Sequence, residues 1–183
     1  MTEDDFEREL YQIAIHEAGH VVVGWCLGWG IECVSIVGEQ DSHGRTLLIP
    51  PARDVTYHGV APIIAQCRGL ETRVRICFGG PLAEARFAGN GLHLVSAHED
   101  FAKGVLLLRQ AAETHDEREK IGDYLFNQTK TLVRRRWKEI NLLATKLVAN
   151  RTIFSEEIEA VVGPRRLEFL SRRQLHVDES RMP

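Results

Sequence analysis

Residues 1–30 carry a helical pattern of apolar and polar positions. Thr2 and Asp5 form a capping-box sequence at its start, and Gly28 and Gly30 follow its last apolar position. The pattern therefore predicts one helix from about residue 4 to residue 27. The apolar positions, which fall largely at helical spacing, are Phe6, Leu10, Ile13, Val21 and Leu27.

A β-hairpin is predicted after this helix. Residues 31–37 are rich in β-branched side chains, and residues 46–49 form a second short apolar run after a glycine-containing turn region. The next segment, 50–62, is rich in Pro, Gly, Asp and His without a clear period, which indicates a loop. The sequence thus predicts a small sheet with a loop after it.

A second helix is predicted from about residue 60. Its apolar positions recur at helical spacing as far as Gly79 and Gly80, where two successive glycines predict its end. Pro81 then opens a fresh turn leading to Phe87, because the first turn of a helix tolerates proline. Residues 88–94 are predicted to form a glycine-containing loop.

Further helix starts are indicated in the second half of the chain. Capping-box sequences at 96–99 and 114–117 precede an apolar run and a long periodic stretch that ends near Asn150. Ser155 is expected to cap a short last helix through Val162. Taken together, the patterns predict a mainly α fold with a small β-hairpin or sheet.

Length and composition fit one domain. The 183 residues, 44% of them hydrophobic, suffice for an ordinary core, and we expect that domain to span residues 1–163. Beyond residue 164 the composition turns to Arg, Glu, Gln and Ser, so 164–183 should form a loosely ordered tail or a short helix. A net charge of −3 with mixed signs, and an Arg run at 134–136 typical of a solvated helix face, predict no nucleic-acid partner.

Cysteine spacing and hydropathy predict a cytoplasmic protein without a membrane span. The four cysteines form neither a C-x-x-C pair nor a compact disulfide framework, and the N-terminus does not resemble a signal peptide. The most apolar stretch, 13–27, contains His16, Glu17 and His20. In lipid these side chains would cost several kcal/mol, so the stretch is predicted to be a core helix.

A metal-binding motif lies within the first predicted helix. His16-Glu17-Ala18-Gly19-His20 is an H-E-x-x-H sequence, and its spacing puts both imidazoles on one helix face. Such sites bind zinc through the histidines and use the glutamate as general base toward a water on the metal. The alternative is a polar helix face with two solvated histidines. The apolar flanks disfavour this alternative, because an unliganded cluster of His, Glu and His is costly to bury. Gly19 destabilises the helix by about 1 kcal/mol relative to Ala, a cost that is understandable if another group approaches the backbone there.

A catalytic zinc needs a third protein ligand. The longer metzincin pattern fails, because Val23 and Cys26 stand where Gly and His are required. Glu99 is already used by a predicted capping box, and Asp100 suits the first turn of a helix for reasons unrelated to metal. Spacing alone does not choose among the candidates. They are Glu71, Glu84, His93, His98, Glu99 and Asp100.

Several sequence blocks, in order, resemble the peptidase domain of FtsH-type metalloproteases over roughly residues 5–163. The resemblance implies that family's helical peptidase fold, zinc as cofactor, and Asp100 as the third ligand beside His16 and His20. Pro81 and Ala85 replace an Arg and a second Glu of the family pattern, which leaves Glu84 either as an acid that supports a ligand or as a solvated residue of its helix. The blocks that carry the likeness are Ile15–Gly24, Cys33–Ile36, Gly44–Pro50, Phe78–Glu84, Ser96–Asp100 and Asn150–Ile158.

The implied activity is that of a zinc metalloendopeptidase acting on flexible or unfolded polypeptides, with Glu17 as the general base. The alternative is a related binding or regulatory module that holds zinc but has little or no proteolytic activity; Glu17 argues against it, because a structural zinc site has no use for a base. No residue stands out as an oxyanion stabiliser. The loop or near-loop candidates are Tyr57, His58, His93 and His98.

The resemblance covers only the peptidase part of the family. In that family, transmembrane segments and an ATPase module normally precede the peptidase part. We recognise neither pattern in this sequence, so we expect a stand-alone domain. Residues 38–46 miss the P-loop pattern by one residue and by an Arg in place of Lys, so ATP binding by this chain is not expected. A separate ATPase and a homo-oligomer are the further partners that the likeness suggests.

Overall fold

The computed structural model of the chain describes residues 2–37, 45–49, 62–89 and 94–164; for 45, 49, 62–68 and 94–97 only the backbone is described. The predicted loop 50–62 and the tail beyond 164 therefore lie outside the described residues, apart from Pro62. The elements in chain order are α1 (Glu3–Cys26), β1 (Gly30–Ser35), β2 (Arg45–Ile49), α2 (Pro62–Ala88), α3 (Leu94–Ala111), α4 (His115–Arg135), α5 (Trp137–Asn150), β3 (Thr152–Phe154) and α6 (Ser155–Val162). The predicted mainly α fold with a small sheet is confirmed.

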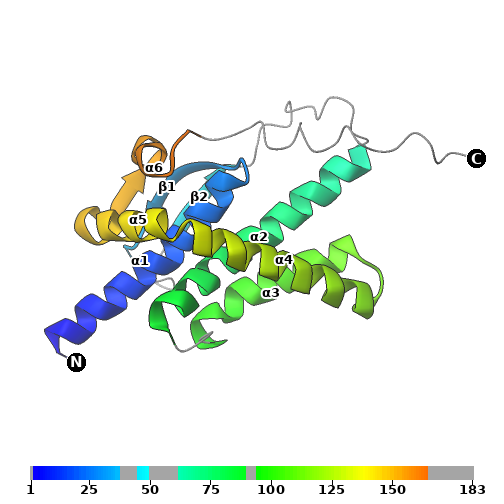
Figure 1. Cartoon of the computed structure of the whole chain (residues 1–183), viewed down its shortest axis with the longest axis horizontal. Coiled ribbons are helices and arrows are strands. Elements are labelled where there is room, and N and C mark those ends of the chain that lie inside the picture. Colours follow the sequence, from blue (N-terminus) through cyan, green and yellow to red (C-terminus); the bar gives the residue numbers. More distant parts are fainter. Residues whose placement is uncertain (1, 38–44, 50–61, 90–93, 165–183) are drawn as a thin grey trace, which may run out of the picture.

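Helix α1 is the centre of the fold and packs against α2 and α5 (Figure 1). The predicted capping box is present: the Thr2 hydroxyl accepts from the Asp5 N–H, and the Asp5 side chain accepts from the Thr2 N–H. The N-terminal turns are exposed, whereas Ala14, Ala18 and Val22 are fully buried. The motif therefore lies in the half of α1 that other elements cover.

The sheet has the strand order β2-β1-β3, and both pairings are antiparallel. The β1–β2 hairpin was predicted, and its register runs from Gly30 opposite Ile49 to Ser35 opposite Arg45. Strand β3 was missed, because its three residues are too few to show alternation. It pairs with a strand more than a hundred positions away in the chain, and Val34 faces Ile153. This leaves β2 at an edge of the described sheet.

Helix α2 runs without a break through Gly79, Gly80 and Pro81, so the predicted end at the two glycines is wrong. Proline inside a helix removes one hydrogen bond and costs about 3 kcal/mol or more. The cost is offset by tertiary packing, since Leu82 and Ala83, which follow the proline, are almost completely buried. The local sequence pattern could not predict this packing, because it depends on residues far away in the chain.

Two other predicted boundaries change. Helix α3 begins at Leu94, so the predicted capping box at 96–99 is wrong, because these residues lie inside the helix. The stretch from 114 to 150 is two helices, and the chain turns at Arg136 (φ −103°, ψ 19°) between α4 and α5. The capping box at Thr114 and Glu117 is confirmed. The last helix begins at Ser155, one residue earlier than predicted, because Phe154 and not Ser155 occupies the N-cap position.

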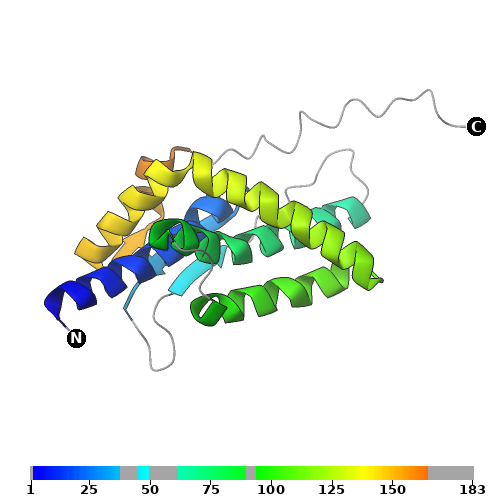
Figure 2. The same cartoon turned by 60° about the horizontal axis from the view of Figure 1, so that its bottom comes forward.

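Helices α3 and α4 meet at one end and diverge from there (Figure 2). Both pack on α2, and they contact it more extensively than they contact each other. Within the described ranges, none of the helices combines the length and the apolar character needed to cross a bilayer.

Candidate metal centre

Three side chains from two helices converge at the middle of the fold. Helix α1 supplies His16 and His20, whose rings lie one turn apart with centroids separated by 4.8 Å. Helix α3 supplies Asp100, and the three side chains are only 12–15% exposed. Sequence spacing left six candidates for a third partner of the histidines. The structure places Asp100 beside them.

The donor atoms of these three residues form a small triangle. The Nε2 atoms of His16 and His20 lie 3.1 Å apart, and Oδ2 of Asp100 lies 2.9 Å from the first and 3.1 Å from the second. Ligand atoms of a tetrahedral zinc site, each about 2.0–2.1 Å from the metal, are about 3.3 Å apart. Among the described residues this is the group whose ligand atoms are close enough to share one metal ion.

The opposite nitrogen of each imidazole is held by an acceptor. His20 Nδ1 donates to the Ile76 carbonyl at 2.7 Å, and His16 Nδ1 donates to Oε2 of Glu84 at 2.9 Å. Glu84 is buried, and its Oε1 accepts from Nε2 of Gln12 at 2.6 Å. Protons on both Nδ1 atoms leave the Nε2 lone pairs pointing at the centre of the triangle, as metal ligation requires. The predicted supporting acid Glu84 thus lies behind His16.

The electrostatics of the triangle call for a positive charge. Burial disfavours the imidazolium of His16, but hydrogen bonds with Asp100 and Glu84 raise its pKa to about 9. Burial also opposes ionisation of Asp100, yet its hydrogen bonds with His16 and His20 hold its pKa well below the usual range. Two imidazoles and a carboxylate facing one another at 3 Å repel unless a proton or a cation lies between them. The donor set, nitrogen and oxygen, suits zinc.

Gly80 keeps the centre of the triangle accessible. A Cβ atom at this position would lie 2.5 Å from Nε2 of His20 and 2.7 Å from Nε2 of His16. Every other amino acid would therefore bring a carbon atom into the space that the two imidazoles face. This is the physical reason for a glycine here, in the middle of a helix that it otherwise weakens.

A pair of facing glycines, Gly19 and Gly79, sets the distance between α1 and α2. A Cβ on Gly19 would lie 2.5 Å from the carbonyl oxygen of Gly79, and a Cβ on Gly79 would lie 2.8 Å from the carbonyl oxygen of Gly19. The sequence-based inference that something approaches the backbone at Gly19 is confirmed. The close approach allows Ile76 and Glu84 of α2 to reach the histidines of α1.

Glu17 lies beside the triangle without belonging to it. Its side chain is buried, and its Oε2 accepts a hydrogen bond from the Thr46 hydroxyl at 2.7 Å. Thr46 comes from β2, so the hairpin holds the glutamate of the motif in place. Oε1 of Glu17 has no hydrogen-bond partner among the described residues. A buried carboxylate with one oxygen fixed and the other available has the form of a general base.

The remaining sequence candidates lie elsewhere. Glu71, His98 and Glu99 are exposed, and Glu99 pairs with Lys103 at 3.5 Å. Tyr57, His58 and His93 lie outside the described residues. Sequence reasoning missed Gln12, Thr46 and Ile76. Gln12 could have been found from its position one turn before His16 on the same helix. The Ile76 carbonyl could not, because a backbone acceptor leaves no trace in the sequence.

Comparison with known proteins gives a distant similarity to a zinc metalloprotease. No family model matches the chain. The ATP-dependent zinc metalloprotease FtsH of Chloroflexus aggregans is 24% identical over 129 residues, which is 69% of this chain and 19% of the relative. This chain is distantly similar to FtsH. It spans about a fifth of that protein's length, so the similarity concerns a region and not the whole enzyme.

Proposed function

We propose that this chain is a zinc metallopeptidase in which His16, His20 and Asp100 hold the metal and Glu17 is the general base. The observation that carries the proposal is the convergence of three ligand atoms within 3.1 Å of one another beside a buried glutamate. The similarity to a zinc metalloprotease supports it independently.

The residues divide the chemistry among them. Zinc, when bound, makes a water molecule more acidic and polarises a substrate carbonyl. Glu17 takes the proton of the attacking water on Oε1 and passes it to the leaving amine, while Thr46 holds Oε2. Glu84 and the Ile76 carbonyl keep both imidazoles in the tautomer that presents Nε2.

The substrate we propose is an extended, flexible or unfolded polypeptide. Strand β2 is at the edge of the described sheet and carries Thr46, the partner of Glu17. A peptide that adds to this edge as a further strand is held by main-chain hydrogen bonds and passes close to the base. Flexible chains need no unfolding motor; a separate ATPase partner would extend the activity to folded substrates.

The test of the proposal is zinc-dependent hydrolysis. The zinc-loaded chain should cleave a permanently unfolded protein such as reduced, carboxymethylated α-lactalbumin, with new amino termini as the readout. Removal of the metal with 1,10-phenanthroline should stop cleavage, and added zinc should restore it. Stoichiometric zinc binding without any cleavage would contradict the peptidase and favour the binding or regulatory module.

Gly80→Ala should weaken zinc binding by at least about tenfold, because its Cβ would occupy the space between the two Nε2 atoms. Gly69→Ala is the matched control, since Gly69 lies in the same helix and a Cβ there meets nothing within 4 Å. The control should bind zinc like the wild type and be about 1 kcal/mol more stable. Competition with a chromophoric chelator measures the affinity; equal affinities for both variants would place the metal elsewhere.

Thr46→Val should lower kcat by about ten- to a hundredfold with little change in KM, since Glu17 loses the hydroxyl that orients it. Thr46→Ser keeps a hydroxyl and should recover most of the rate. Zinc affinity should be the same in all three proteins. A Val variant as active as the wild type would show that the hydrogen bond has no part in catalysis.

A further inference from the structure

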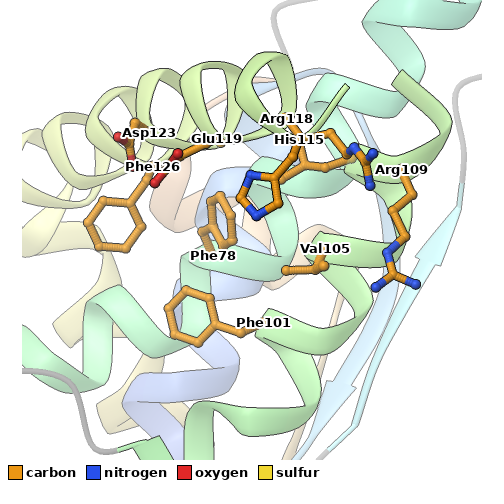
Figure 3. Close-up of a pocket in the computed structure, with 11 residues that line it drawn as sticks. Phe78, Phe101, Val105, Arg109, His115, Arg118, Glu119, Asp123 and Phe126 are labelled. Carbon is orange, nitrogen blue, oxygen red and sulfur yellow. The ribbon is translucent and has the colours of Figure 1, made fainter. Parts of the chain in front are cut away.

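A cavity of about 400 Å³ lies between the diverging helices α3 and α4, on the side chain of Phe78 from α2 (Figure 3). It is a separate feature from the metal centre, because none of the three triangle residues lines it. Its volume is within the range of about 300–1,000 Å³ that small-molecule sites occupy. The proposed peptidase chemistry does not use it.

The floor of the cavity is aromatic. The ring centroid of Phe78 lies 5.4 Å from that of Phe101 and 5.7 Å from that of Phe126, so three rings from three helices meet there. Leu108 and Gly122 complete the apolar lining. Val105 stands at the rim and is 48% exposed, although it is a large apolar side chain. An apolar group that enters the cavity would cover these surfaces.

The rim has a cationic end. Arg109 is exposed and has no ion pair among the described residues, while the guanidinium of Arg118 donates to the carbonyls of Glu113 and Thr114 at 2.8 and 2.9 Å. These two bonds fix the position of Arg118, and neither partner is a carboxylate that would neutralise it. His115, the first residue of α4, lies beside it (Figure 3).

The opposite end of the rim is acidic. Glu119 and Asp123, which lie one turn apart on α4, line the cavity on the side away from Arg109 (Figure 3). The separation of charge gives a bound molecule a direction. An anionic group is attracted to the end with Arg109 and Arg118 and repelled from the end with Glu119 and Asp123.

We propose that this cavity binds a small aliphatic carboxylate, such as a medium-chain fatty acid anion. The chain lies on the three phenylalanine rings, and the carboxylate pairs with Arg109 at the cationic end. Arginine suits this role because its planar guanidinium binds a carboxylate through two hydrogen bonds. The binding does not depend on zinc or on Glu17, so it stands or falls separately from the peptidase.

Calorimetric titration of the full chain with octanoate and with 1-octanol tests the proposal. The wild type should bind octanoate saturably and more tightly than 1-octanol. Arg109→Gln should weaken octanoate binding by about tenfold or more, because a charge-assisted pair is lost, and leave 1-octanol unaffected. Arg134→Gln is the control, since Arg134 is an exposed arginine of α4 that does not line the cavity.

A second variant tests the location. Val105→Trp places a large ring at the exposed rim position and should abolish binding of octanoate and 1-octanol alike, with circular dichroism confirming the fold. No saturable binding by the wild type, equal octanoate affinity in Arg109→Gln, or unchanged binding in Val105→Trp would each overturn the proposal.

Discussion

Glu17→Gln is expected to lower peptide hydrolysis by about 10²–10⁴-fold, the usual contribution of a general base, while zinc binding is unchanged. Glutamine has nearly the shape of glutamate, and its carbonyl oxygen can still accept the hydrogen bond that Thr46 donates at 2.7 Å. The amide cannot take a proton from water. Cleavage of the unfolded substrate and zinc content, measured on the same preparation, separate the two effects.

The control for this variant is Glu9→Gln, which changes an exposed glutamate on the same helix. It should leave both hydrolysis and zinc content at wild-type values. If Glu17→Gln cleaves as fast as the wild type, another group removes the proton and the proposed mechanism is wrong. If it loses zinc as well, Glu17 supports the metal centre in a way that the hydrogen bonds around it do not indicate.

Asp100→Ala is expected to reduce zinc affinity by at least about a hundredfold, because loss of residues that merely support ligands already costs about 10–100-fold. The substitution removes the only carboxylate of the triangle and leaves His16 and His20 as two ligands where a catalytic zinc site has three. Hydrolysis should fall with the zinc content. Chelator competition gives the affinity, and thermal unfolding without metal shows whether the fold is retained.

Glu99→Ala provides a matched control next to Asp100. The Glu99 side chain is 84% exposed, and its ion pair with Lys103 has the long distance of 3.5 Å. Its removal should change neither zinc affinity nor hydrolysis. Full zinc affinity in Asp100→Ala would exclude that residue as a ligand, whatever the peptidase activity.

Sequence periodicity was a good guide where structure depends on neighbours in the chain. The capping box at Thr2, the length of α1 and the β1–β2 hairpin followed from local patterns. The spacing of His16 and His20 on a helix already predicted that their rings share one face. These features depend on contacts between residues that are close in the chain, so a short stretch of sequence is enough to predict them.

Local signals failed where distant parts of the chain meet. Two glycines predicted the end of α2 and a fresh turn at Pro81, but packing on α1 keeps the helix continuous. Strand β3 exists because β1 offers it hydrogen bonds, and its own three residues give little indication of it. A helix start at Ser96 was predicted from a capping pattern that the structure does not use.

The candidate metal centre shows the same division. By itself, the sequence determined a pair of histidines and a glutamate on one turn of a helix, because a periodic backbone fixes which side chains share a face. Spacing could not choose Asp100 from the downstream acids; a family resemblance suggested it, and only the packing of α3 on α2 brought its carboxylate within 3.1 Å of both imidazoles. The glycine contacts that let α1 and α2 approach, and the Thr46 bond from the hairpin, were likewise decided by tertiary structure. Such contacts join residues far apart in the chain, and their free energy arises only when the whole core is assembled.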